Sequence, residues 1–276
     1  MPPLAILESM FNTDADQSGL PAIEIQGLCR NFGEFEAVRE LTLSVPQGAF
    51  FGFLGPNGAG KSTTLKMLTG LLQPDKGRIQ ILGEDIWQTP ATVKRWIGVV
   101  PENMSLFERL TAPEYLEFVA GMYGLDASTA RSRSQELLDL MQLSAKSETL
   151  LADFSHGMKK KTALAAALIH SPRILFLDEP FEGVDPVSAR TLRELLQSLT
   201  ARNVTVFLTS HILETVEKLC NYLGIIHKGQ LLTQGPLQEV LHRINGSMPL
   251  GTASLEDAFI RLIGHEREHS DLSWLS

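Results

Sequence analysis

Apolar and polar residues alternate in two short segments near the start of this chain. Residues 23–26 (Ile-Glu-Ile-Gln) and 41–45 (Leu-Thr-Leu-Ser-Val) have a period of two, which predicts half-exposed antiparallel strands. Residues 79–82 fit another strand. Residues 49–54 and 96–101 are nearly continuous apolar runs, which are typical of buried strands, and a proline ends the second.

The pattern changes further along the chain. From about residue 113 to residue 170 the apolar positions fall at helical spacing. Residues 174–177 and 204–208 are apolar runs again, typical of strands buried on both faces of a parallel sheet. A closing hairpin is expected over 223–232, and a small, mostly helical extension over 236–276. The pattern therefore predicts an α/β fold with a parallel sheet and an antiparallel β portion.

Composition narrows the class of protein. The chain has 276 residues, of which 43% are hydrophobic, so it can bury one large core with a subdomain, or two smaller cores. The formal net charge is −8 and there is no basic block, which argues against nucleic acid as the main partner. Cys29 and Cys220 are far apart in sequence and show no metal-binding spacing, which favours a reduced, cytosolic setting.

The hydrophobic segments are all short. None approaches the roughly 18 to 20 apolar residues that a membrane-spanning helix needs. Residues 1–20 mix Pro, Asp, Ser and Gly and are expected to form a mobile tail. The first apolar residues have no preceding Lys or Arg, so we do not expect a signal peptide.

A glycine-rich motif carries the strongest chemical signal. It follows the apolar run 49–54, precedes a segment of helical spacing, and comprises Gly55, Pro56, Asn57, Gly58, Ala59, Gly60, Lys61, Ser62 and Thr63. The spacing is that of a phosphate loop, in which backbone N–H groups and the positive end of a helix dipole converge on an anion. Lys61 is expected to reach the β- and γ-phosphates and Ser62 to ligate Mg²⁺. The alternative is an ordinary glycine-rich turn between a strand and a helix.

Two carboxylates end one of the buried strands. Asp178 and Glu179 follow the run 174–177, at the sheet edge where open parallel sheets bind ligands. Asp178 fits a Mg²⁺-associated carboxylate, and Glu179 fits the group that polarises the attacking water. The alternative is a solvated acidic turn. His211 follows the next strand and would contact the γ-phosphate, or it could be a histidine near a helix start that Ser210 caps.

A loop and a lysine cluster precede an alanine-rich helical segment. Residues 154–158 read Phe-Ser-His-Gly-Met, and Lys159, Lys160 and Lys161 follow. Lysines near a helix N-terminus oppose the helix dipole, which would suit a docked anion. For the individual lysines we favour the simpler interpretation, a solvated basic face.

Together these motifs resemble the ATP-binding cassette family. The phosphate loop, the Ser-x-Gly loop, the Asp-Glu-Pro strand end, residues 183–186 and residues 209–211 occur in that family's order across roughly residues 21–235. The resemblance implies a P-loop NTPase core with a RecA-like parallel sheet, an antiparallel β subdomain and an inserted helical subdomain at about 106–171. It also implies a head-to-tail dimer that holds two ATP molecules.

The resemblance assigns further residues to the ATP site. Phe32 matches the aromatic that stacks on adenine; the alternative is an ordinary aromatic at a strand end. Ser155 and Gly157 match the signature loop, which acts on the ATP of the other subunit, and Asp185 matches the loop that links the two sites. Two departures stand out. The family's usual Leu-Ser-Gly-Gly-Gln signature is Phe-Ser-His-Gly-Met here, and Glu102 occupies the usual position of a Mg²⁺-associated glutamine.

The surroundings of Glu102, the signature loop and residues 255–259 are similar to exporter-type ATPase subunits for drugs, lipids and polysaccharides. The resemblance implies an ATPase at the cytoplasmic face of the inner membrane that powers export through a separate transmembrane permease, with a second ATPase subunit. One alternative is a soluble cassette machine in DNA repair or translation, although the chain lacks the long coiled coils and zinc cysteines usual there. Another is a regulatory cassette without turnover, which Glu179 and His211 argue against.

Overall fold

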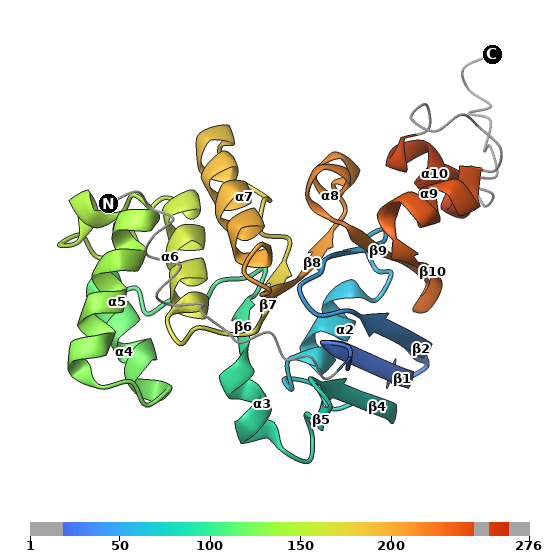
Figure 1. The fold of residues 1–276 in the computed structure, drawn as a ribbon, viewed down its shortest axis with the longest axis horizontal. Coiled ribbons are helices and arrows are strands. Elements are labelled where there is room, and N and C mark those ends of the chain that lie inside the picture. The colour runs from blue at the N-terminus through green and yellow to red at the C-terminus, as the bar shows by residue number, and fades with distance from the viewer. Residues whose placement is uncertain (1–18, 246–253, 265–276) are drawn as a thin grey trace.

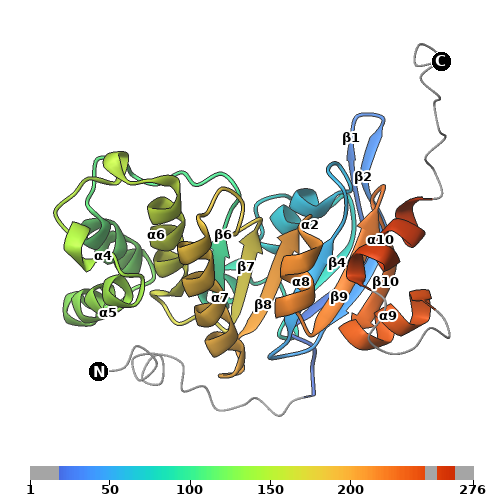
Figure 2. The same cartoon turned by 90° about the horizontal axis from the view of Figure 1, so that it is seen from above.

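The computed structural model describes residues 19–245 and 254–264 (Figures 1 and 2). The predicted tail falls almost entirely on residues 1–18, which lie outside the described residues, as do residues 246–253 and 265–276 of the C-terminal extension. Among the described residues, no helix is long and apolar enough to cross a bilayer.

A small antiparallel sheet is built from the segments with alternating polarity. It has four strands in the order β2-β1-β4-β5, with bounds β1 (Ile23–Phe32), β2 (Phe35–Val45), β4 (Lys76–Ile81) and β5 (Glu84–Asp85). Along β1, Ile23, Ile25 and Leu28 are fully buried. The period of two therefore places one face of this sheet against the core.

The large sheet has six strands in the order β10-β9-β3-β8-β7-β6. Its bounds are β3 (Phe50–Leu54), β6 (Ile97–Val100), β7 (Ile174–Asp178), β8 (Thr205–Ser210), β9 (Tyr222–His227) and β10 (Gln230–Pro236). Neighbouring strands run parallel except β10, which forms an antiparallel hairpin with β9. The parallel sheet and the closing hairpin are confirmed.

Both faces of the large sheet are covered, which explains its continuous apolar runs. Phe51 and Phe53 of β3 pack toward the antiparallel sheet, whereas Phe50 and Leu54 belong to the core on the other side. Phe207 is the centre of an aromatic group, with its ring stacked 5.2 Å from that of Phe51. Figure 2 shows α7 and α8 on one face of this sheet and α2 on the other.

Helices connect the strands and form one end of the molecule (Figure 1). Their bounds are α2 (Lys61–Leu68), α3 (Pro90–Trp96), α4 (Ala112–Met122), α5 (Ala127–Leu140), α6 (His156–Leu168), α7 (Pro186–Thr200), α8 (Leu213–Leu219), α9 (Leu237–Asn245) and α10 (Leu255–Ile263), with short 3₁₀ turns at Ser144–Lys146 and Leu151–Asp153. The helices α4, α5 and α6 pack together, away from the antiparallel sheet.

Local capping explains where the helices of this end begin. The Thr111 side chain and Glu114 form a reciprocal capping box at the start of α4. Asp126 accepts hydrogen bonds from two N–H groups in the first turn of α5. One expectation was wrong in detail: Trp96 ends α3 rather than starting the strand, which begins at Ile97.

Candidate active site

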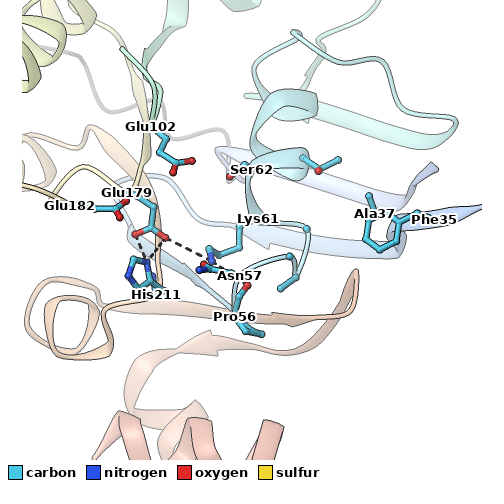
Figure 3. A pocket seen from close by; sticks show the side chains of 14 residues that line it. Phe35, Ala37, Pro56, Asn57, Lys61, Ser62, Glu102, Glu179, Glu182 and His211 are labelled. Carbon is cyan, nitrogen blue, oxygen red and sulfur yellow. Dashed lines mark hydrogen bonds and ion pairs between the residues drawn. The ribbon is translucent and has the colours of Figure 1, made fainter. Parts of the chain in front are cut away.

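A cavity of about 400 Å³ opens at the carboxyl ends of the parallel strands (Figure 3). The strands β3, β7 and β8 end here, and α2 begins here. Its lining brings together segments from across the chain: Phe35, Ala37, Pro56, Asn57, Gly58, Ala59, Gly60, Lys61, Ser62, Thr63, Glu102, Glu179, Glu182 and His211. The edge of the sheet is therefore the site that the strand-end carboxylates predicted.

The phosphate loop closes tightly at the start of α2. Gly60 has φ +105°, and a Cβ on it would lie 2.5 Å from the carbonyl oxygen of Ala37, so only glycine fits there. No side chain caps the first N–H groups of α2. These donors and the positive end of the helix dipole suit an anion such as phosphate.

Lys61 is buried beside the loop and holds it closed. Its ammonium donates to the carbonyl oxygen of Gly55 at 2.7 Å and lies near that of Pro56. Burial lowers the pKa of Lys61, while the charges of Glu179, Asp178 and Glu102 act in the opposite direction. An incoming phosphate would give this ammonium an anionic partner in addition to Glu179, whose Oε1 lies 3.8 Å away.

Asp178 lies beneath the cavity at the end of β7 and is 6% exposed. The hydroxyl of Thr209 donates to its Oδ1. The Ser62 hydroxyl lies 3.4 Å from the same oxygen. Strand β7 thus places a carboxylate beside the first residues of α2, next to the N–H groups that no side chain caps.

Glu179 is the centre of the polar network. Its Oε1 is 3.0 Å from Nδ1 of His211 and 3.8 Å from the ammonium of Lys61, as the dashed lines in Figure 3 show. Glu179 is 7% exposed, so it does not belong to a solvated acidic turn. Its φ of +47° is in the left-handed region, a conformation that costs a non-glycine residue about 1 to 3 kcal/mol and that recurs at active sites.

His211 faces the carboxylate rather than marking a helix start. Its backbone N–H also points to Oε2 of Glu179, at 3.4 Å. The Ser210 hydroxyl accepts from the N–H of Ile212 in a local turn, and α8 begins only at Leu213. The capping alternative is therefore wrong in detail.

Two acidic side chains share this cavity with Glu179. Glu102 and Glu182 both line it and lie on either side of Glu179 in Figure 3. Sequence reasoning identified Glu102 but missed Glu182, since nothing local distinguishes it from a surface glutamate. Among the described residues, no cluster of three or more His, Cys, Asp or Glu is arranged to hold a metal alone.

Several predicted site residues lie elsewhere. Phe32 is not part of the cavity lining; it is half exposed beside the guanidinium of Arg30, whereas its hairpin neighbour Phe35 lines the cavity. Ser155 caps α6 and Asp185 caps α7. Together with Gly157, these capping residues lie outside the cavity lining of their own chain.

The lysine cluster is not a solvated basic face. Lys160 and Lys161 are buried, at 4% and 8% exposure. Lys159 pairs with Glu108 at 2.7 Å. The solvated interpretation was wrong for Lys160 because the start of α6 packs against the loop after β7, whose carbonyl groups accept hydrogen bonds from its ammonium.

The comparison with protein families matches residues 38–182 to the family described as ABC transporter. The chain belongs to the ABC transporter family. This ABC ATPase is 36% identical over 248 residues to the linearmycin resistance ATP-binding protein LnrL of Bacillus subtilis (strain 168). The aligned region covers 88% of this chain and 80% of the relative. It is 39% identical over 222 residues to the bacitracin transport ATP-binding protein BcrA of Bacillus licheniformis, covering 80% and 72%.

Solved structures agree with this assignment. An ATP-binding subunit of an ABC transporter superposes with a TM-score of 0.80 at 32% identity, covering 87% of this chain and 99% of that one. A dimeric ATP-binding cassette bound to ADP and phosphate has the same fold, with a TM-score of 0.71 at 24% identity. The α/β cassette fold is confirmed, and the chain is the ATP-binding, ATP-hydrolysing subunit of an ABC transporter.

Proposed function

We propose that this ABC ATPase uses Glu179 to activate water against the γ-phosphate of ATP and thereby drives export through a separate transmembrane permease. The observation that carries this proposal is the buried Glu179 carboxylate, held by Lys61 and His211 at the mouth of the phosphate loop. The ATP phosphates occupy the loop, Glu179 orients water for in-line attack, and His211 contacts the γ-phosphate. Lys61 stabilises the charge that develops there.

The donor set around the loop fits Mg²⁺. Ser62 and Asp178 offer hard oxygen ligands within 3.4 Å of one another, and Glu102 faces the same cavity. Mg²⁺ is usually held by one or two protein oxygens together with oxygens of the substrate phosphates. The small number of oxygen ligands at this site therefore suits Mg²⁺. When bound, Mg²⁺ would supply charge compensation for the β- and γ-phosphates.

A second ATPase subunit, either another copy or a related chain, would complete each ATP site. Ser155 is exposed at the start of α6 and Gly157 is buried in its first turn, and both lie outside the cavity of their own chain, which supports a role on the ATP of the other subunit. Asp185 lies beside Gly157, with its carboxylate 3.4 Å from where a Cβ on that glycine would be. Phe32 would stack on adenine at the β1–β2 hairpin.

The permease would contact the helical end of the chain from the cytoplasmic side of the inner membrane. Exposed apolar side chains gather there: Phe107 and Phe118, with ring centroids 5.3 Å apart, are about half exposed, and Met122 is 74% exposed. A cavity of about 280 Å³ lies nearby, lined by Met104, Leu106 and Tyr115 among others. An exposed apolar patch of this kind suits a protein partner. The names of LnrL and BcrA, which concern linearmycin resistance and bacitracin transport, support an antibiotic or drug as the exported cargo.

The substitution Glu179→Gln tests the catalytic assignment. The amide keeps the size of the side chain but cannot accept a proton from water, so we expect turnover to fall by about 100-fold or more. ATP binding, measured with a fluorescent ATP analogue, should persist. Wild-type turnover in this variant would remove Glu179 from the mechanism.

Affinity capture tests the transport assignment. The tagged chain is purified from its own host after membranes are solubilised in mild detergent, and co-purifying proteins are identified by mass spectrometry. A polytopic membrane protein in stoichiometric amount is the expected result. Recovery with ribosomal or DNA-associated proteins from the soluble fraction alone would contradict it.

A further inference from the structure

The lysine at position 160 has an unusual environment. It is 4% exposed, and its ammonium donates to the main-chain oxygen of Glu179 at 2.8 Å and to that of Glu182. These two carbonyl groups belong to one tight turn, in which the N–H of Glu182 also bonds the oxygen of Glu179. One side chain of α6 therefore holds both ends of the turn that begins with the proposed catalytic residue.

A buried ammonium is costly unless polar groups surround it. Burial lowers the pKa of Lys160, and the charges of Glu182, Glu179 and Glu102 oppose this effect. The two carbonyl bonds and the nearby carboxylates thus offset its desolvation. A solvated lysine would need none of these partners, so its burial here points to a role in the loop.

The loop is held on its other side by β8. The N–H of Glu179 points to the carbonyl oxygen and the hydroxyl of Thr209, at 3.3 and 3.2 Å. Glu179 has a left-handed backbone, with φ +47°. Its carboxylate direction depends on this main-chain conformation, which the Thr209 bonds hold at the N–H and the Lys160 bond holds at the carbonyl.

The contact also joins two functional segments. The helix α6 begins at His156, directly after Ser155. The His156 ring lies against Gly183, where a Cβ would be only 3.1 Å away. The first turns of α6 are thus packed along the same loop that starts at Glu179.

We propose that Lys160 is a positioning residue for ATP hydrolysis: its ammonium fixes the main chain of Glu179 and ties that residue to the start of α6. It does not touch ATP and acts through Glu179. The inference rests on the proposed catalytic role of Glu179. A movement of α6 on assembly with a second subunit would reach Glu179 through this contact.

The substitution Lys160→Met is the first test, because methionine has a similar length but no donor. We expect kcat to fall by about 10- to 100-fold, the size of effect that a displacement near 1 Å produces. The KM for ATP should stay within about twofold, since the phosphate loop is untouched. Lys159→Met is the matched control: Lys159 pairs with the exposed Glu108, and kcat should change by less than about twofold.

A conservative variant and a double variant distinguish a positioning role of Lys160 from a general loss of structure. Lys160→Arg keeps the charge and the donors and should restore most of kcat. Lys160→Met added to Glu179→Gln should lower turnover no further, because both act through one group. If Lys160→Met does not fold, Lys160→Gln takes its place: its neutral amide is one atom shorter than the lysine side chain and cannot bond both carbonyl groups as the ammonium does, so a fall in kcat with unchanged KM is again expected.

The outcomes distinguish this inference from the catalytic assignment. Unchanged kcat in Lys160→Met, with Glu179→Gln inactive, would overturn the positioning role alone. A raised KM with unchanged kcat, or independent multiplication of the two effects in the double variant, would also overturn it. Wild-type turnover in Glu179→Gln would instead reject the catalytic assignment on which it rests.

Discussion

Thr209 offers a direct test of what stabilises the buried carboxylate of Asp178, which lies beneath the cavity. Its side chain is fully buried, and its hydroxyl donates to Asp178, which is 6% exposed. The substitution Thr209→Val keeps the shape of the side chain and removes the hydroxyl. In this variant the N–H of Glu179 can still donate to the main-chain oxygen of residue 209, so the main interaction lost is the hydrogen bond to Asp178.

The expected magnitude follows from the burial of the carboxylate. A hydrogen bond to a charged group contributes about 1.5 to 3 kcal/mol, and the loss is near the upper end where the buried acceptor keeps only a long contact, here that of the Ser62 hydroxyl at 3.4 Å. We expect Thr209→Val to lower the free energy of unfolding by about 2 to 3 kcal/mol. For a chain of this size that is a decrease in Tm of roughly 4 to 10 °C.

The assay is thermal and urea unfolding in EDTA without nucleotide, so that ligand binding does not contribute to stability. The matched control is Thr209→Ser, which keeps the hydroxyl and loses one methyl group, at a cost of about 1 kcal/mol. The serine variant should therefore be the more stable of the two. If the valine variant equals or exceeds it, the bond to Asp178 does not support the fold and the reasoning fails.

The remaining predictions concern nucleotide binding, turnover and pH. Phe32→Ala should weaken ATP binding by about 5- to 30-fold through loss of base stacking, with a smaller effect for Phe35→Ala, as titration with a fluorescent ATP analogue would measure; an effect confined to Phe35→Ala would transfer the stacking role to that ring. Glu102→Gln should retain ATPase activity in a coupled assay, because an amide oxygen can also ligate Mg²⁺; complete loss would give the carboxylate a distinct role. Burial lowers the pKa of His170 to about 4, so only the unfolded chain binds its proton between roughly pH 6.5 and pH 4, and this contribution to stability is present above pH 6.5 and lost as pH falls. Between pH 7 and pH 5, the free energy of unfolding, measured by urea titration, should therefore fall by up to about 2 kcal/mol less in His170→Gln than in the wild type. An equal decrease in both proteins would contradict the lowered pKa of His170.

Much of the fold could be predicted because its signals are local. The buried strands were identifiable because strands covered on both faces need apolar residues throughout, as at Phe50–Leu54 and Ile174–Asp178. The helix α3 was missed because its segment, Pro90–Trp96, is short and only Val93 is buried, so it carries little apolar periodicity. The predicted boundaries of the helical subdomain and the extension stay predictions.

The candidate site was predictable only in part. Lys61 and Ser62 follow from motif spacing, and Asp178 and Glu179 from their place at a strand end. Phe35 and Glu182 carry no comparable signal, because each enters the cavity through a turn whose direction depends on distant packing. The pairing of His211 with Glu179, across 32 residues of sequence, likewise required the parallel alignment of β7 and β8.

By itself, the sequence determined the phosphate loop, the apolar strands and the acidic strand end, because glycine conformations, side-chain periodicity and motif spacing are properties of neighbouring residues. Only the tertiary structure decided which charges are buried. Lys159 and Lys160 are adjacent and chemically identical, yet one pairs with Glu108 near the surface and the other bonds the main chain of Glu179 in the interior. The reason is physical: the pKa and the partners of a lysine depend on what packs against it. For Lys160 that is a loop 19 to 22 residues away in sequence, which only the tertiary fold brings to α6.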